Sequence, residues 1–190
     1  MDATAFALFE TALGTGVIAW NAAGVRGTAM PGPDDATQRA YIARRHPQAV
    51  ETAPSGEVTE AIEGVQTLLT TGRAELDHIR LDLADTPPLH QRVYDIARAI
   101  PPGETLTYGD IARRLGNVNL AREVGQALGK NPIPIIVPCH RILAANGATG
   151  GFSAPGGVDT KLKLLTIERA RTTAAPSLFD LADLPLAARR

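Results

Sequence analysis

A change of residue pattern at Thr86-Pro87-Pro88 constrains the fold of this chain more than any other sequence feature. Short apolar runs separated by turn residues come before it, and apolar residues at helical spacing come after it. Because consecutive prolines remove backbone donors, no helix or central strand continues through them. The chain is therefore predicted to divide into residues 1–85, residues 86–171 and a tail over residues 172–190.

The first part predicts an antiparallel meander. Three β-prone runs alternate with turn residues, at Ala5–Leu13, Val17–Trp20 and Val25–Met30. Gly14-Thr15-Gly16 and Asn21-Ala22-Ala23-Gly24 are the predicted turns between the runs, and Pro31-Gly32-Pro33 ends the last of them.

Two helices and one further strand are predicted after the meander. Asp34-Asp35 can cap a helix that runs to about Arg45. A second helix is predicted after Pro54-Ser55, and Gly72 stops it. Alternating apolar residues then predict one more strand, at Ile79, Leu81 and Leu83.

Beyond the two prolines the pattern is helical. One apolar helix face is formed by Val93, Ile96, Ala97 and Ile100. Thr107 can cap a short helix over Tyr108–Leu115, and another is predicted over about Leu120–Leu128. Two short helices joined by a tight glycine-containing turn form a helix-turn-helix pattern, although such pairs are also common packing units. A last helix carries Leu162, Leu164, Leu165 and Ile167.

Cysteine usage and apolar runs exclude several protein classes. One cysteine in 190 residues rules out a disulfide within the chain and every multi-cysteine zinc pattern, so no metal site is expected. No apolar run approaches the roughly 18 residues of a membrane helix. Met1-Asp2-Ala3-Thr4 places no basic residue ahead of its apolar stretch, which disfavours a secretory signal. We therefore expect a cytoplasmic protein without a membrane partner, associated with the nucleoid if it is bacterial.

Charge is distributed unevenly along the chain. Residues 1–88 hold 6 Lys and Arg against 12 Asp and Glu, whereas residues 89–170 hold 10 against 6. A basic segment in a chain of net charge −1 is compatible with a surface that faces a polyanion, and equally with an ordinary solvated surface.

Pro138-Cys139-His140-Arg141 is the chemically distinctive segment. A thiol is a useful nucleophile only as a thiolate, so His140 could remove its proton and Arg141 could stabilise the anion. The preceding prolines, Pro134 among them, would hold the sulfur in place. A lone cysteine is also commonly buried as a small hydrophobe, and both readings stay open on residue chemistry alone.

The segment Ile136–Ile142 closely resembles the active-site signature of the methylated-DNA–protein-cysteine methyltransferases, the O6-alkylguanine-DNA alkyltransferases. Further matching segments follow the family's order and cover roughly residues 87–170: Pro102–Thr105, Tyr108–Ala112, Ala121–Gly125, Gly129–Pro134, Gly150–Ser153, Gly156-Gly157, Lys161 and Leu164–Glu168. The resemblance implies an α+β fold. It has an N-terminal ribonuclease-H-like α/β module with an antiparallel sheet, and a mostly helical domain with a winged-helix-like helix-turn-helix.

What this resemblance implies is DNA repair by direct reversal of damage. Cys139 would accept an alkyl group from O6 of guanine, or from O4 of thymine, in double-stranded DNA, in a single turnover and without a cofactor. His140 would be the base, acting through a water, and Glu168 on the last helix would orient it. Tyr108 and Lys161 would help the guanine to leave in neutral form, whereas residue chemistry alone makes them a packing aromatic and a surface lysine. The protein is expected to act as a monomer.

The resemblance also implies the residues that bind DNA and the lesion. An arginine on the recognition helix, here Arg122, would fill the gap left by a flipped nucleotide, with the helix working from the minor groove. The expected DNA-binding residues are Tyr108, Ala121, Arg122, Gly125 and Arg141. The expected pocket residues are Asn131, Pro134, Phe152 and Ser153, with Asn131 bracing its loop against the cysteine turn.

Three departures from the family pattern bear on the lesion and on DNA. Phe152 stands where the family usually has tyrosine, so the ring is kept and a hydroxyl is lost. Ala154-Pro155 makes the loop before Lys161 about two residues longer, which leaves the preferred alkyl size open. Glu123 follows Arg122 where a small residue is usual, and an acid beside DNA would weaken phosphate attraction unless it faces the protein.

Two other functions remain as alternatives. Relatives that bind alkyl lesions without repairing them lack the cysteine, so Cys139 argues against a non-enzymatic lesion binder. A cysteine hydrolase built on Cys139 and His140 would need an oxyanion hole, for which no motif is found.

Overall fold

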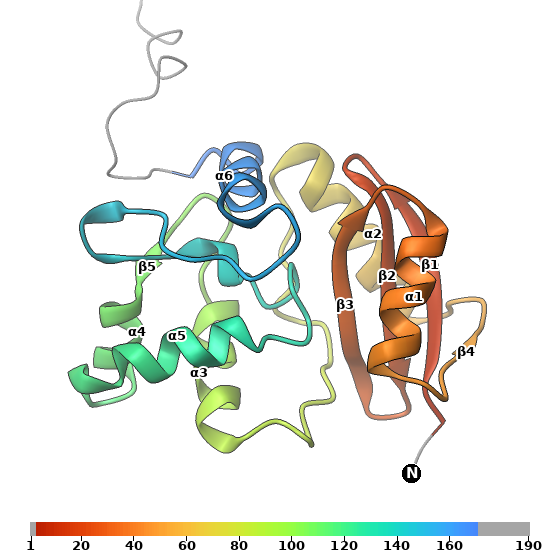
Figure 1. Cartoon of the computed structure of the whole chain (residues 1–190), viewed down its shortest axis with the longest axis horizontal. Helices are drawn as coiled ribbons and strands as arrows, with labels where there is room; N and C mark the ends of the chain where they lie inside the picture. Colours follow the sequence, from red (N-terminus) through yellow and green to blue (C-terminus); the bar gives the residue numbers. More distant parts are fainter. Residues whose placement is uncertain (1–2, 171–190) are drawn as a thin grey trace, which may run out of the picture.

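The computed structural model describes residues 3–170. Its N-terminal part is a four-stranded sheet of order β3-β2-β1-β4 (Figure 1), formed by β1 (Ala5–Thr11), β2 (Gly14–Asn21), β3 (Gly24–Gly32) and β4 (Val50–Glu51). The first three strands are antiparallel, which confirms the predicted meander. The two-residue β4 pairs parallel to β1 at Ala5 and Phe6, and it is too short for any periodicity to predict it.

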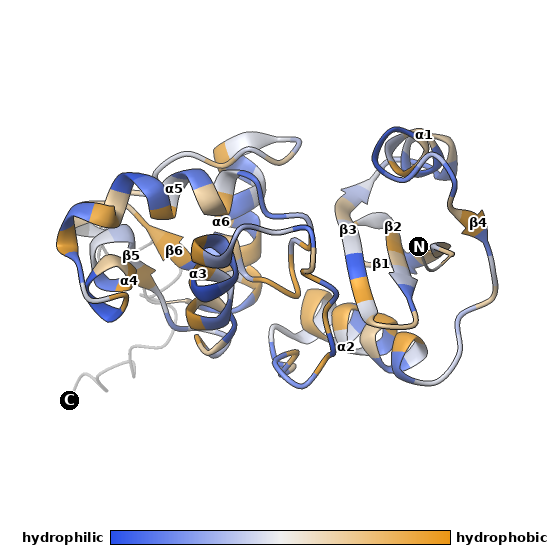
Figure 2. Cartoon of the chain, turned by 90° about the horizontal axis from the view of Figure 1, so that it is seen from below, coloured by the Kyte–Doolittle hydropathy of each residue, from blue (hydrophilic) through white to orange (hydrophobic). Residues whose placement is uncertain are grey.

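Helices α1 (Asp35–Arg45) and α2 (Glu57–Thr71) cover opposite faces of this sheet (Figure 2). Both confirm the predicted helices. The Asp34 carboxylate caps α1 by accepting from the backbone N–H of Thr37, and Gly72 ends α2 in a left-handed conformation with φ 72°.

The predicted turn at Gly14-Thr15-Gly16 is wrong, because these residues begin β2. Their partners in β1 are Thr11, Glu10 and Phe9, so the turn is Ala12-Leu13 instead. Gly16 can lie in the strand because its missing side chain leaves room for the Phe9 ring, which would stand 2.7 Å from a Cβ built there.

The predicted strand over residues 79–83 is also wrong. Only Leu81 forms a bridge, parallel to Val25 at the start of β3. The rest of the free edge of β3 is occupied by another segment: the N–H of Thr28 donates to the Pro132 carbonyl at 3.1 Å, and its Oγ1 donates to the Pro134 carbonyl at 2.7 Å. The alternating apolar residues of 79–83 therefore bury side chains, but the segment forms no continuous ladder of backbone hydrogen bonds with β3.

The C-terminal part confirms the predicted helix pair. Its regular elements are α3 (Pro88–Arg98), β5 (Leu106–Thr107), α4 (Tyr108–Arg114), the 3₁₀ turn η1 (Val118–Leu120), α5 (Ala121–Gly129), η2 (Cys139–Arg141), β6 (Ile142–Leu143), η3 (Ala145–Gly147) and α6 (Gly157–Ile167). A capping box between Thr107 and Asp110 starts α4.

The winged-helix and ribonuclease-H comparisons stay predictions, and the predicted tail over 172–190 lies outside the described residues. Within residues 3–170, no helix is long and apolar enough to cross a membrane.

One continuous apolar core joins the two parts. Ile18 of β2 and Leu68 of α2 belong to the same buried cluster as Tyr94 of α3 and Ile136 before the cysteine. Together with the Thr28 hydrogen bonds, this core fixes the cysteine-bearing segment to the N-terminal sheet. The boundary at residue 85 therefore separates two parts of the sequence, but both parts share one hydrophobic core.

We expect Gly72→Ala to destabilise the protein by about 2–4 kcal/mol, through left-handed backbone strain and a steric collision. A Cβ at this position would stand 1.9 Å from the Ile167 carbonyl oxygen, immediately before Glu168. Gly116→Ala is the matched control, because Gly116 also has a positive φ, 89°, but faces open space. Thermal unfolding measures the stability of both variants. An equal loss of stability in the two would mean that the backbone near Ile167 moves away from the new methyl group at little cost.

Candidate functional site

The segment that carries the cysteine is a tight, proline-containing turn. Nδ2 of Asn131 donates to the Val137 carbonyl at 2.9 Å, and Oδ1 of Asn131 accepts from the Ile133 N–H at 2.9 Å. Ile135 has φ 76°, an unfavourable conformation for a β-branched residue that its buried surroundings maintain. Asn131 thus braces this turn from within, and nothing in the sequence pattern indicates the strained Ile135.

Cys139 opens the 3₁₀ turn η2 and is half-buried. In an extended strand, Cys139 and His140 would point to opposite sides. The 3₁₀ turn bends the chain at this point. Burial raises the pKa of the Cys139 thiol, against a hydrogen bond with Asn131, the positive charge of Lys161 and the backbone N–H groups of Cys139 and His140, all of which lower it. The thiol therefore needs a base to become a nucleophile.

His140 and Glu168 form a buried pair behind the cysteine. Nε2 of His140 lies 2.9 Å from Oε1 of Glu168. Burial lowers the pKa of His140 even though Glu168 opposes the shift, so the ring is neutral near pH 7 and can accept a proton. Nδ1 of His140 is buried and has no hydrogen-bond partner among residues 3–170.

Arg141 is not placed to bind DNA, and the prediction that it does so is wrong. Its side chain is buried, because Nε and Nη2 donate to the two carboxylate oxygens of Glu168 at 2.9 and 2.8 Å, and Nη1 donates to the Ile100 carbonyl. Burial alone would raise the pKa of Glu168, but the hydrogen bonds of His140 and Arg141 lower it to about 2. Arg141 therefore binds the carboxylate of Glu168, and that carboxylate in turn binds His140.

Lys161 is fully buried, so the surface lysine expected from residue chemistry alone is wrong. Its Nζ donates to the Ile142 carbonyl, and burial lowers its pKa to about 8, against the attraction of Cys139. Tyr108 opens α4 and is half-buried. Burial, followed by the proximity of Cys139, raises the pKa of its hydroxyl.

The thiol opens into a pocket of about 340 Å³, here called the reaction pocket. Its walls come from α4, α5 and the loop before α6: Tyr108, Gly125, Leu128, Gly129, Cys139, Gly151, Phe152 and Ser153. The Ser153 hydroxyl donates to the Gly129 carbonyl at 3.2 Å. Sequence reasoning missed Leu128, Gly129 and Gly151, which no chemical signal distinguishes from other apolar or glycine residues. Asn131 and Pro134 lie outside this pocket, on a neighbouring groove that also reaches Cys139.

Helix α5, which forms part of the wall of the reaction pocket, carries an exposed basic residue. Arg122 is exposed, Ala121 is half-buried, and Gly125 lies against the Tyr108 ring, 3.9 Å from a Cβ built on the glycine. Oε2 of Glu123 is buried and has no hydrogen-bond partner among the described residues. Glu123 thus turns at least one oxygen toward the protein.

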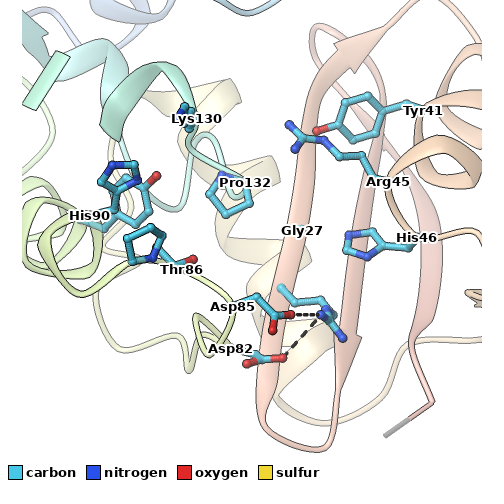
Figure 3. Close-up of a pocket in the computed structure, with 13 residues that line it drawn as sticks. Gly27, Tyr41, Arg45, His46, Asp82, Asp85, Thr86, His90, Lys130 and Pro132 are labelled. Carbon is cyan, nitrogen blue, oxygen red and sulfur yellow. Dashed lines mark hydrogen bonds and ion pairs between the residues drawn. The ribbon is translucent and has the colours of Figure 1, made fainter. Parts of the chain in front are cut away.

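Another hollow, of about 350 Å³, lies between the two parts of the chain and does not contain the thiol (Figure 3). Tyr41, Arg45 and His46 face it from the N-terminal side, and His90 and Lys130 from the other. Two ion pairs in its wall join Arg26 to Asp82 and to the exposed Asp85, at 3.9 and 3.0 Å. The described residues contain no group of three or more His, Cys, Asp or Glu side chains that could hold a metal ion.

Sequence comparisons agree with this geometry. The family model of the 6-O-methylguanine DNA methyltransferase DNA-binding domain matches residues 88–170. The methylated-DNA–protein-cysteine methyltransferases of Mycobacterium tuberculosis and Mycobacterium bovis are each 40% identical over 129 residues, which is 68% of this chain and 76% of theirs. The chain belongs to the methylated-DNA–protein-cysteine methyltransferase family.

Solved structures of methyltransferases in this family share the α+β fold. Mycobacterium tuberculosis OGT in complex with DNA superposes with a TM-score of 0.68 at 28% identity, covering 94% of this chain and 99% of that one. The O6-methylguanine-DNA methyltransferase of Pyrococcus kodakaraensis gives a TM-score of 0.64 at 26% identity, covering 87% and 98%. Family membership makes this chain a DNA-repair alkyltransferase.

Proposed function

We propose that this chain transfers one alkyl group, methyl above all, from O6 of guanine or O4 of thymine in double-stranded DNA to Cys139. The observation that carries the proposal is a thiol at the wall of the reaction pocket, beside the buried His140–Glu168 pair. A thioether is stable and nothing in the chain would restore the thiol, so each molecule acts once.

The reaction balances without a further reactant. Sγ of Cys139 forms a bond to the alkyl carbon, and the bond from that carbon to O6 breaks. The thiol proton passes to His140 through a water at Nδ1, and the departing guanine takes one proton from the Tyr108 hydroxyl. The proton on His140 then returns to Tyr108 through solvent, so in the net reaction the thiol proton ends on the guanine. Glu168 keeps Nε2 of His140 occupied, which leaves Nδ1 to accept the proton. No cofactor is required.

Tyr108 and Lys161 are proposed to assist the departing base. The Tyr108 hydroxyl, whose pKa is raised by burial above its ordinary value of 10.0, is protonated at neutral pH and can donate a hydrogen bond to the guanine. Lys161 has a pKa of about 8, so most molecules carry the ammonium form at neutral pH, and this cation stabilises the thiolate. Phe152 would stack on the base, and Ser153, Asn131 and Pro134 would shape its surroundings.

The helix pair α4–α5 is the proposed DNA-binding surface, acting from the minor groove on a nucleotide turned out of the stack. The Mycobacterium tuberculosis relative was solved in complex with DNA, which supports DNA as the partner of this chain. Arg122 would occupy the vacated stack, with Ala121, Gly125 and Tyr108 against the DNA. We further propose that the chain acts as a monomer without a membrane partner, and that residues 86–171 hold all groups that react.

Incubation with an oligonucleotide containing O6-methylguanine tests the proposal. The expected result is a mass increase of one methyl group on the Cys139 peptide, with no more than one equivalent of guanine restored per protein molecule. Binding without transfer would indicate a lesion-binding protein, and repeated turnover would contradict the single-use mechanism.

We expect Arg122→Ala to slow repair in duplex DNA by about 10- to 100-fold, because base stacking contributes about 1–3 kcal/mol. Reaction with the free base O6-methylguanine should change far less, since no stack has to be filled. Arg73→Ala is the matched control: it removes one exposed positive charge from the N-terminal part, away from α5. Equal losses on both substrates would contradict the proposed role of Arg122.

A further inference from the structure

The cavity of about 350 Å³ between the two parts of the chain, here called the interdomain hollow, is lined by basic side chains from both sides (Figure 3). Arg45 and His46 come from the end of α1, His90 from the start of α3 and Lys130 from the end of α5. These elements are distant in sequence, so the four side chains meet only in the folded chain. Cys139 does not line this hollow, and the proposed alkyl transfer makes no use of it.

Two acids also line the interdomain hollow, and both are already paired. Asp82 and Asp85 form ion pairs with Arg26, at 3.9 and 3.0 Å. Within residues 3–170, neither Arg45 nor Lys130 forms an ion pair. The walls therefore carry three basic side chains that are charged at neutral pH against two carboxylates, and the surplus positive charge lies on the two cations without a partner.

The N-terminal wall of the hollow is held in place without being neutralised. The Arg45 guanidinium lies over the Tyr41 ring, 5.5 Å from the ring centroid. The Tyr41 hydroxyl in turn donates to the Thr28 carbonyl at 3.2 Å. His46 lies against β3, where a Cβ built on Gly27 would stand 2.8 Å from its Nε2. Both basic groups are thus positioned in advance, which lowers the entropic cost of binding a ligand between the walls.

The two histidines respond to the positive charge of the hollow. Burial lowers the pKa of His46, and the charges of Arg26 and Arg45 lower it further. Burial also lowers the pKa of His90, and the charge of Lys130 adds to the effect. Because cations that disfavour a proton favour an anion, a negative charge entering the hollow would bring protons to both imidazoles.

Basic residues at helix ends also have a simpler role. Arg45 is the last residue of α1 and Lys130 follows the last residue of α5, and a positive charge at either position is favoured by the helix dipole. The dipole does not require two such helix ends to meet at one cavity with an imidazole beside each. That convergence is the feature that points to a ligand.

We propose that the interdomain hollow binds a phosphate group, with Arg45 and His46 on one side of it and Lys130 and His90 on the other. A guanidinium matches phosphate oxygens with two parallel N–H donors, and an ammonium and protonated imidazoles can donate to the remaining oxygens. The bound phosphate would join the two parts of the chain, because each part contributes half of the groups around it. A free phosphate and a phosphodiester of DNA share this chemistry, and the experiments below distinguish the two sources.

Titration of the histidines by NMR at constant ionic strength tests the proposal. Sulfate is the probe, because it stays a dianion over the pH range in which imidazoles titrate. We expect saturating sulfate to raise the pKa of His46 and of His90 by about 1 or more, the effect of an opposite charge at about 4–6 Å. By linkage, sulfate should bind more tightly as the pH falls through this range. His78 is exposed and outside the hollow, so it is the internal control.

The double variant Arg45→Gln, Lys130→Gln should lower the affinity for sulfate by at least about tenfold, because two charge-assisted hydrogen bonds are lost. The matched control is Arg44→Gln, Lys163→Gln, which removes two exposed positive charges outside the hollow. Equal affinities for sulfate in the two double variants would overturn the proposal. A sulfate-dependent change at His78 as large as that at the two histidines of the hollow would overturn it as well.

Binding of an undamaged duplex, followed by fluorescence anisotropy, identifies the source of the phosphate. For a phosphate of DNA, Arg45→Gln, Lys130→Gln should bind the duplex more weakly than the control variant, with a salt dependence of log Kd that is shallower by about 1–2 in slope. For a free phosphate, the same variant should lose sulfate binding while its affinity for the duplex equals that of the control.

Discussion

Cys139→Ala is expected to abolish alkyl transfer completely while DNA affinity stays within about twofold of the unmodified chain, the range of a substitution that breaks no structural feature. The side chain loses only its sulfur at a half-buried position, and the helix pair α4–α5 is untouched. No other cysteine is present to take over. Mass spectrometry after incubation with O6-methylguanine DNA measures transfer, and fluorescence anisotropy measures binding.

Cys139→Ser is the control for shape, because a hydroxyl occupies nearly the same space but is far less nucleophilic at neutral pH. Its expected result is the same loss of transfer with retained binding. Residual methylation of either variant would identify an acceptor other than residue 139. Loss of DNA binding in both would mean that the reactive turn and the DNA-binding surface are not separable.

Glu168→Gln should have the second largest effect, because it removes the charge that compensates a buried guanidinium. Arg141 donates to both oxygens of Glu168 and is itself buried, and removing one partner of such a pair costs about 3–5 kcal/mol of unfolding free energy. Transfer should slow as well, since His140 loses the carboxylate that orients it. Denaturant unfolding and single-turnover kinetics report the two losses separately.

The double variant Glu168→Gln, Arg141→Met separates stability from activity. Without a buried cation to compensate, much of the unfolding free energy should return, because an apolar side chain is tolerated where an unpaired charge is not. The rate of transfer should stay low, since His140 is still held by a neutral amide. Full recovery of the rate would assign Glu168 a structural role only.

The same carboxylate predicts an acid dependence of stability. The folded-state pKa of Glu168, about 2, lies below its ordinary value of 4.5, so its contribution is present above pH 4.5 and is lost as the pH falls toward 2. The pKa of His140 in the folded state is lowered from its ordinary value of 6.5. Its contribution to stability is therefore present above pH 6.5 and is lost as the pH falls below 6.5. Glu168→Gln should flatten the part of the stability profile between pH 4.5 and 2.

Much of the site follows from sequence because its signals are local. Capping residues and glycines define the α4–α5 pair, and a thiol beside an imidazole marks the reactive turn. Contacts between distant segments leave no such signal. Arg141 was expected on DNA because nothing in its neighbourhood indicates a carboxylate 27 residues away in sequence. The strand predicted at residues 79–83 does not form for a similar reason, because a segment distant in sequence, with Pro132 and Pro134, occupies the edge of β3.

That pairing of β3 with the proline segment has a consequence for how the chain is made. Thr28 and Pro134 are 106 positions apart, so at about 5–20 residues per second the ribosome needs roughly 5–20 s to supply the second after the first. During that interval the nascent sheet exposes an unpaired strand edge, the feature that most readily recruits other chains into aggregates. Shortened products that end before the proline segment should therefore be insoluble, and chaperones that shield strand edges should matter most for this chain while it is being translated.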